Sequence, residues 1–494
     1  MRKFLRNNYF YIFLLVPLFF ICVINIRPDN DIWFLLNNGR YIFQHGIPKV
    51  DPFTIHEGLD YIMQQWLTSA IFWKVYDFFG PKGILTMVML LAILLIYLYY
   101  RLCFTISNNK KLSVLITAII MVLCYKKIVS RPQMFTYMAL ILEMIFLEMY
   151  IKKDNWKYLI PLVIISLLEI NLHSTMWCFL FLVLIPYILN GIKIKNITID
   201  KVRVMPLIIV GILMILVGLI NPYGHKSLLI IVNSYGSSNI NSHVTEMQPL
   251  TIDKFDGKSL ILSLLIYFGL VNLKKKERID IRHICIFVGF TLLAFLHNKG
   301  FPYYAMALGV VLASHFRKID IDKLEKKVFK NFIKVWKPIV YALSFFVFIS
   351  AIYTVYLEYS YFKWGTFTSY PAVFDVIEEN YDLEDVRMYT TFDDGGYFEY
   401  KEIKVYVDPR AEVFLKKFNH KEDILDEYYY LNYDSNYDIE DFLNKYHFTH
   451  LFVPVKSYLY KYLINDDNYE IVYKEYLDVE KTKLDKCLFV YKGE

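Results

Sequence analysis

The sequence is poor in the residues that build a metal centre or a disulfide framework. Its six cysteines show neither metal-ligand spacing nor a paired pattern, and most lie in or beside apolar runs. It contains no glycine-rich phosphate loop, no HExxH helix and no GxSxG turn. A nucleotide-dependent enzyme and a zinc hydrolase are therefore unsupported. The pattern indicates no particular cofactor and leaves a divalent metal ion open.

Long apolar runs dominate the chain instead. Hydrophobic residues make up 56% of its 494 residues, aromatic residues make up 18%, and the mean hydropathy is +0.34. Soluble domains hold about 45–50% apolar residues, so this composition indicates a membrane protein. The net charge of +6 is modest and is expected in cytoplasmic loops, so nucleic-acid binding is not indicated.

The apolar runs predict about eleven membrane-spanning helices, several of them shorter than the usual ~20 residues. The first run lacks a small-x-small cleavage site, so we expect an uncleaved span there. The segment 62–79 is apolar on one side only and predicts an interfacial helix. The expected spans are 8–26, 82–101, 112–126, 133–151, 157–171, 175–191, 204–220, 259–273, 282–297, 301–316 and 336–358.

The distribution of charge supports this topology. With the basic N-terminus inside, every predicted inside loop is rich in Lys and Arg, as the positive-inside rule expects. The odd number of spans then places the C-terminus outside. One outer turn, with Lys126, Lys127 and Arg131, carries basic residues on the opposite side and needs a separate explanation.

The stretch 27–56, directly after the first span, is too long and too mixed in charge for a plain connector. An acid at the membrane edge can act as the general base on an acceptor hydroxyl, and we assign this role to Asp31, with Asp29 as a second candidate. Asp51 is a third acid, suited to a sugar hydroxyl or a metal. The alternative is a structural cap, in which these acids cap helices or form turns.

Further polar residues fall at the same outer side. Arg131 precedes Pro132 at the start of a helix, and a helix N-terminus beside an arginine predicts a site for the phosphate of a lipid carrier. The alternatives are ordinary snorkelling of basic side chains and capping of helix ends. The other residues assigned to substrate binding are Trp33, His56, Lys126, Asn171, His173, Glu246 and Lys299.

The sequence becomes acidic, tyrosine-rich and turn-containing from about residue 359. We expect residues 1–358 to form the membrane domain, with a first outer loop at 27–81, and residues 359–494 to form a small extracytoplasmic α/β domain. The segment VRMYTTFDDGGYFEYKEIKVYVD predicts strand, turn and strand, with Asp394, Gly395 and Gly396 in the turn. HKEDILDEYYYL and IEDFLNKYH predict helices, whereas THLFVPV, YEIVYKEY and KCLFVYK predict strands.

Short motifs follow one another in a specific order along most of the chain. They are Asp31-x-Trp33, Gly39-x-x-Ile42, Gly46-x-Pro48-x-x-Asp51-Pro52-Phe53-Thr54, Gln65-Trp66-Leu67, Arg131-Pro132-Gln133, Asn171-x-His173, Asn221-Pro222-Tyr223-Gly224, Glu246-x-Gln248-Pro249, Lys299-x-x-Pro302, Gly395-Gly396-Tyr397 and Asp408-x-Arg410. In this order they resemble a group of bacterial polytopic membrane proteins of the C-type glycosyltransferase (GT-C) superfamily. Leu35 and Gln65 stand where that group often has His and Glu.

The resemblance implies a GT-C-like fold, a lipid-phosphate sugar donor, transfer at the outer face and an acidic base, which by position is Asp31. We therefore predict transfer of a hexosyl or pentosyl group from a polyprenyl-phosphate-linked sugar to a glycan, lipid or protein of the bacterial cell envelope. Arg131, with Lys126 and Lys299, would hold the donor phosphate.

Two other functions stay open: a transporter or flippase for a lipid-linked glycan, and a non-catalytic envelope assembly protein. A transporter usually carries ionisable residues at the bilayer midplane and shows inverted repeats. Here the ionisable residues gather at the outer edge and no repeat is visible in the sequence, which favours the enzyme.

Overall fold

The computed structural model describes residues 30–190, 203–235, 246–273, 280–321, 370–477 and 480–493, together with residues 345, 349 and 353. The expected spans 8–26 and 336–358 and the candidate base Asp29 lie outside these residues. The chain forms two compact units. The helical unit draws on 82–231 and 245–362, and the α/β unit draws on 28–81, 232–244 and 363–494.

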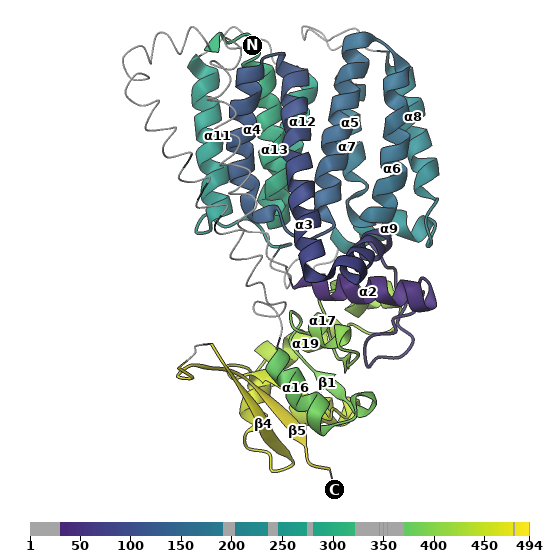
Figure 1. Ribbon diagram of the computed structural model, residues 1–494, viewed down its shortest axis with the longest axis vertical. Helices are drawn as coiled ribbons and strands as arrows, with labels where there is room; N and C mark the ends of the chain where they lie inside the picture. Colours follow the sequence, from purple (N-terminus) through teal and green to yellow (C-terminus); the bar gives the residue numbers. More distant parts are fainter. Residues whose placement is uncertain are drawn as a thin grey trace. The chain divides into compact units, whose positions relative to one another are not determined.

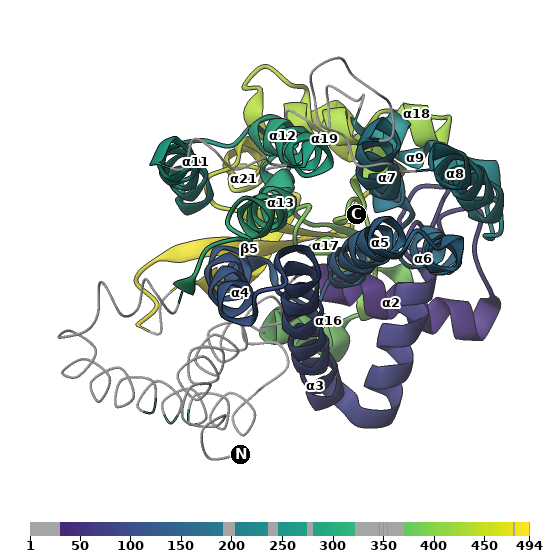
Figure 2. The same ribbon diagram turned by 90° about the horizontal axis from the view of Figure 1, so that it is seen from above.

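Within the described residues, the apolar runs of the helical unit form helices where the sequence predicts them. The long helices run side by side in Figure 1 and are seen end on in Figure 2. The helices are α3 (Trp66–Ser107), α4 (Lys110–Cys124), α5 (Gln133–Lys153), α6 (Ile160–Leu172), α7 (Phe179–Asn190), α8 (Val204–Gly218), α9 (His225–Tyr235), α11 (Phe255–Leu273), α12 (Ile281–Leu296) and α13 (Phe301–His315).

Helix α3 is interrupted at Gly80. This glycine has φ 62° and precedes Pro81, a combination that breaks a helix because only glycine adopts the left-handed region without strain. The part before Gly80 belongs to the α/β unit and the part after Pro81 to the helical unit. The break thus falls where the sequence separates the expected interfacial helix 62–79 from the span 82–101.

Among the described helices, α3, α5 and α11 are long and apolar enough to cross a membrane. Shorter apolar helices cover Ser174–Asn190, α8 and α12. By this measure the expected count of about eleven spans is wrong. Hydropathy locates apolar segments correctly, but a helix of 15 residues such as α8 rises only about 22 Å, less than the ~30 Å hydrocarbon core. Exposed Ile and Leu side chains along α8 and α11 still indicate a membrane protein.

The α/β unit is built on a five-stranded sheet of order β2-β1-β3-β5-β4. Strand β1 (Arg387–Tyr389) pairs in parallel with β2 (Lys404–Val405) and β3 (His450–Pro454). Strand β5 (Leu484–Tyr491) pairs antiparallel with β3 and β4 (Tyr469–Tyr476). The helices of this unit are α2 (Asp31–His45), the first part of α3, α16 (Pro371–Asn380), α17 (Gly395–Tyr400), α18 (Lys416–Asn419), α19 (Ile424–Tyr433), α20 (Ile439–Tyr446) and α21 (Tyr458–Leu463).

The two strands expected on either side of Gly395 are confirmed as β1 and β2, and Asp394 lies in a turn, but the expected turn at Gly395 and Gly396 is wrong. The later strands and the helices α19 and α20 are confirmed. Residues Gly395–Tyr400 form helix α17, and this helix connects two parallel strands instead of a hairpin. A Cβ at Gly395 would lie 2.0 Å from the carbonyl oxygen of Val407. The glycine therefore serves close backbone packing and not a tight turn, a distinction that a local pattern does not contain.

The stretch after the first apolar run folds as helix α2 and packs on α17 inside the α/β unit. Trp33 is 3% exposed, and its ring lies 5.2 Å from that of Tyr397 and 5.1 Å from that of Tyr400. The backbone N–H of Ile55 donates to Val405 at 3.0 Å, which fastens the following residues to the edge strand β2. Residues 28–81 thus pack with the C-terminal part of the chain.

Arg410 holds this arrangement together. Its Nη1 lies 2.6 Å from Oδ1 of Asp51, which is 359 positions away in the sequence. Its Nη2 lies 2.5 Å from Oδ2 of Asp408 and 3.2 Å from Oε1 of Glu399. All four side chains are almost fully buried. Asp51 also accepts hydrogen bonds from the backbone N–H and hydroxyl of Thr54, so it both forms a turn and binds Arg410.

One guanidinium faces three carboxyl groups in this cluster, so they cannot all be ionised at low cost. Burial and the neighbouring charge of Asp408 raise the pKa of Glu399 well above its ordinary value, although Arg410 opposes the shift. Glu399 therefore keeps its proton where a solvated carboxyl would lose it.

Replacing Arg410 by Ala should lower the free energy of unfolding of the α/β unit by about 3–5 kcal/mol, because buried carboxylates lose their partner. Arg410→Lys should recover only part of this loss, since an ammonium cannot serve Asp51 and Asp408 with the same fork of donors. Denaturation followed by hydrogen exchange of the sheet amides measures both. An unchanged Arg410→Ala protein would contradict the role of this cluster.

The stability of the α/β unit should fall as pH rises. Because the pKa of Glu399 is raised in the folded state, its contribution is complete below the unfolded value of about 4.3 and is lost as pH rises through the folded value. Burial lowers the pKa of His450 to about 4, which gives the opposite slope, but only below its unfolded value of about 6.5. The difference between the melting temperatures of the wild type and Glu399→Gln across pH isolates the contribution of Glu399, and this variant should flatten the fall above the unfolded value.

Candidate functional site

Helix α5 carries polar residues at both of its ends. Arg131 lies just before its first residue, Gln133, and Glu148 lies near its last, Lys153. A helix of 21 residues is about 30 Å long, so these side chains belong to two separate sites of the helical unit.

The first site contains the Arg131–Glu246 ion pair. Nη1 of Arg131 lies 2.5 Å from Oε1 of Glu246, with the arginine side chain 16% exposed and the glutamate 47%. The segment that carries Glu246 is fastened to the turn η4 (Asn298–Gly300): the backbone N–H of Lys299 donates to the Glu246 carbonyl at 3.0 Å. In the same segment the His297 ring contacts the Met247 carbonyl at 2.6 Å.

His173 belongs to the same end of the helical unit. Its Nδ1 lies 2.8 Å from the hydroxyl of Thr136 in the first turn of α5, and that hydroxyl donates to Oε1 of Glu169 at 2.5 Å. The charge of Lys299 is close enough to act on the His173 ring.

The sequence analysis assigned Arg131, His173, Glu246 and Lys299 to one substrate site from separate outer loops. The structure places them at one end of the helical unit, while their role in binding remains a prediction. Asn171 is also there, but it donates to the Ile220 carbonyl at 3.0 Å and thereby joins the ends of α6 and α8. That contact accounts for Asn171 structurally.

Buried polar atoms without partners gather in the same short segments. Within the part of the chain that the structure describes, Oε1 of Gln133, Oγ of Ser174, Oγ1 of Thr175 and Oδ1 of Asn298 are buried without a hydrogen bond. Each of these residues lies within two positions of Arg131, His173 or Lys299. An unsatisfied buried polar group costs about 1–3 kcal/mol, so such atoms commonly mark a functional constraint.

The basic residues that break the positive-inside pattern all have partners. Arg131 pairs with Glu246, Lys127 pairs with Asp256 at 3.1 Å, and Lys126 lies 5.1 Å from the centre of the Phe255 ring. Their charges are therefore neutralised or packed on an aromatic ring. This finding explains how the turn before α5 accommodates three basic residues, and it gives Lys126 a contact with the start of α11.

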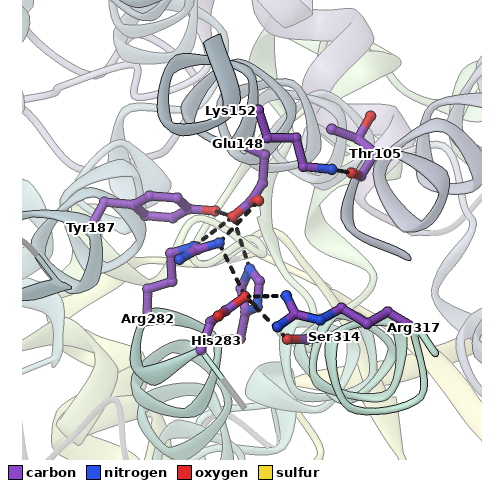
Figure 3. A network of polar contacts seen from close by, with 9 residues as sticks. Thr105, Glu148, Lys152, Tyr187, Arg282, His283, Ser314 and Arg317 are labelled. Atoms are coloured by element: carbon purple, nitrogen blue, oxygen red, sulfur yellow. Dashed lines mark hydrogen bonds and ion pairs between the residues drawn. The ribbon is translucent and has the colours of Figure 1, made fainter. Parts of the chain in front are cut away.

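The second site, at the other end of α5, is a closed ion-pair network (Figure 3). Oε1 of Glu148 lies 2.7 Å from Nε of Arg282, 2.9 Å from Nε2 of His283 and 3.0 Å from the Tyr187 hydroxyl. Both Glu148 and Arg282 are at most 4% exposed. The network joins helices α5, α7 and α12.

Asp280 extends this network to the end of α13. Its Oδ2 lies 3.2 Å from Arg282 Nη2 and 3.2 Å from Arg317 Nη1, with the Ser314 hydroxyl at 3.5 Å. With both oxygens of Glu148 and Oδ2 of Asp280 engaged by cations, the second site is a brace between helices. The sequence analysis missed it, although a glutamate inside an apolar helix was a usable signal.

The remaining candidates lie in the α/β unit. Asp31 is half-buried in the first turn of α2, where a helix N-terminus favours a negative charge. Trp33 is a core residue of α2 that packs on α17, and Asp51 is bound by Arg410. His56 contacts the Tyr406 carbonyl at 2.8 Å, and burial lowers its pKa. These contacts give Trp33, Asp51 and His56 structural roles; their catalytic or binding roles stay predictions, as does that of Asp31.

Two matched substitutions distinguish the brace from the first site. Arg282→Ala should cost about 3–5 kcal/mol of stability, because Glu148 is left charged and buried. Arg131→Ala should cost at most about 1 kcal/mol, since the half-exposed Glu246 regains water. Thermal denaturation of both variants in the same detergent tests this, and equal losses would contradict the assignment.

No protein-family model and no curated protein matches the sequence. Two crystal structures of the Archaeoglobus fulgidus oligosaccharyltransferase share its fold. One, tethered by a disulfide bond to an acceptor peptide containing the NVT sequon, is 12% identical, with a TM-score of 0.62 over 100% of this chain and 75% of that chain. The other, a complex with Zn and sulfate, is 12% identical, with a TM-score of 0.51 over 90% and 68% respectively. The fold is therefore GT-C-like, which confirms the fold that the resemblance implies.

Proposed function

We propose that the protein is a membrane glycosyltransferase that uses a polyprenyl-phosphate-linked sugar and glycosylates a cell-envelope acceptor at the outer face of the plasma membrane. The observation that carries the proposal is the gathering of Arg131, Lys299 and His173 at one end of a GT-C-like helical unit. These residues come from three segments far apart in the sequence. An arginine and a lysine in one place suit a phosphate that leaves with negative charge.

The proposed reaction requires one group to bind the leaving phosphate and another to accept the acceptor's proton. The bond between the anomeric carbon and the phosphate oxygen breaks, the acceptor oxygen bonds to that carbon, and the acceptor proton passes to a base. We assign the phosphate to Arg131 and Lys299 and the proton to Asp31. Arg131 presents a fork of donors that matches phosphate oxygens, whereas Lys299 adds a point charge. The fold of the oligosaccharyltransferase neighbours supports glycosyl transfer as the class of reaction and leaves the sugar and the acceptor open.

Turnover tests this proposal directly. The protein in nanodiscs is given a panel of polyprenyl-phosphate sugars, and sugar transfer or slow donor hydrolysis is measured. Asp31→Asn should lower turnover by about 10²–10⁴-fold while donor binding persists, because a general base contributes about that much. Asp60→Asn is the control, since Asp60 is a half-exposed acid of the same unit that faces His420 at 3.7 Å.

Other outcomes point to the other functions. Donor binding with no turnover by the wild type favours the flippase, whose substrate is the same lipid-linked glycan. If the protein binds no lipid-linked sugar, the glycosyltransferase function is excluded and the assembly-protein function remains. If Asp31→Asn is fully active, the protein is still a glycosyltransferase, but Asp31 is not its general base.

A further inference from the structure

The Arg131–Glu246 pair differs from the enclosed arginine pairs of the brace and of the Arg410 cluster, and it shares its asymmetry with Arg40–Glu402 of the α/β unit, whose side chains are 18% and 70% exposed. In the brace, Glu148 is 1% exposed, and in the Arg410 cluster the three carboxyl side chains are at most 1% exposed. Glu246 is 47% exposed although its arginine is only 16% exposed. One partner is therefore held by the protein while the other reaches solvent.

We propose that the carboxylate of Glu246 occupies the phosphate position on Arg131 and has to be displaced when a lipid-linked phosphate binds. This inference rests on the proposed function, because it assumes that Arg131 receives the donor phosphate. Carboxylate and phosphate oxygens present the same kind of acceptor to a guanidinium, so one can stand in for the other. At 2.5 Å, Oε1 of Glu246 takes the position of such an oxygen on Nη1.

The backbone around the pair is anchored, so only a side chain has to move. The Glu246 carbonyl accepts from the N–H of Lys299 at 3.0 Å, and the Gln248 carbonyl accepts from the N–H of Asn298 at 2.8 Å. On the other side, the Arg131 carbonyl accepts from Met134 at 3.2 Å at the start of α5. A rotation of the Glu246 side chain into solvent opens Nη1 and leaves these hydrogen bonds intact.

The charge of the ligand decides whether Glu246 is displaced from Arg131. Without a donor, Glu246 neutralises Arg131 in a partly buried position, where an unpaired guanidinium is costly. A phosphate replaces that charge and brings further acceptor oxygens, whereas a neutral lipid offers nothing in return. An anionic headgroup therefore compensates for the loss of the Arg131–Glu246 pair, whereas an uncharged lipid does not.

Binding of a sugar-free probe isolates this step from the reaction. The affinity of the nanodisc-embedded protein for a short-chain polyprenyl monophosphate is measured by calorimetry. Glu246→Gln should bind the probe about two- to fivefold more tightly, since a partly exposed pair is worth up to about 1 kcal/mol and 1.4 kcal/mol is tenfold. Glu246→Ala should show the same direction, and thermal denaturation confirms that both variants are folded.

Asp256→Asn provides the matched control. It also removes one carboxylate, but from Lys127, which it meets at 3.1 Å. We expect a smaller change in affinity than for Glu246→Gln. In addition, Arg131→Ala should weaken probe binding and should cancel the gain when combined with Glu246→Gln, because the two side chains act through one contact.

The outcomes distinguish this inference from the function on which it rests. Weaker or unchanged binding by Glu246→Gln overturns the displacement while Arg131 remains a phosphate site. Equal gains in probe affinity for Glu246→Gln and Asp256→Asn would show that removing any nearby negative charge favours binding. This result would also overturn the displacement of Glu246. Failure of the wild type and of both Glu246 variants to bind the probe removes the proposed donor site itself.

Discussion

A charged side chain that leaves water has to find an opposite charge, and this constraint organises both units of the protein. Arg410 satisfies it with Asp51, Asp408 and Glu399, and Arg282 satisfies it with Glu148. Every carboxylate removed from solvent at these points restricts which segments can lie together. Apolar packing brings helices into contact but fixes their mutual register only loosely, whereas a buried guanidinium accepts few arrangements.

The exposure of the acidic partner distinguishes the Arg131–Glu246 pair from the brace and from the Arg410 cluster. Glu148 and the acids around Arg410 are enclosed, so breaking those pairs leaves a charge in a medium that solvates it poorly. Glu246 is half exposed and can exchange its arginine for water at little cost. Near Arg131, Gln133, Ser174, Thr175 and Asn298 also keep buried polar atoms without partners in the described residues. An end of the helical unit with an exchangeable pair and unsatisfied groups is suited to ligand binding, whereas a fully paired network is suited to bracing.

The likeness to oligosaccharyltransferases concerns the fold, since only 12% of residues are identical. One fold can host unrelated functions, so the function has to be argued from the site. Here two cations suit a phosphate, and an acid at the start of α2 suits proton abstraction in the proposed transfer. The cations and the acid belong to different units, and each is open to separate mutation.

Sequence alone determined the features that depend on local pattern. It located the apolar helices of the described helical unit, the strands His450–Pro454, Tyr469–Tyr476 and Leu484–Tyr491, and the short helices α19 and α20, because periodicity and composition act over a few residues. It also singled out Arg131, Glu246, Lys299 and His173, because charge at the ends of apolar runs is visible without a fold.

Only the tertiary structure decided what these residues meet. Arg410 binds an acid 359 positions away, and Arg282 binds one 134 positions away. Gly395 permits close packing against Val407 instead of a hairpin turn, and the stretch after the first apolar run begins with a helix, α2, that packs on α17. A local sequence pattern shows the chemical type of each side chain and the spacing of apolar residues along the chain. The partner of a buried charge depends on the whole fold. The cost of desolvating the charge is offset only where the fold brings a distant segment with an opposite charge next to it.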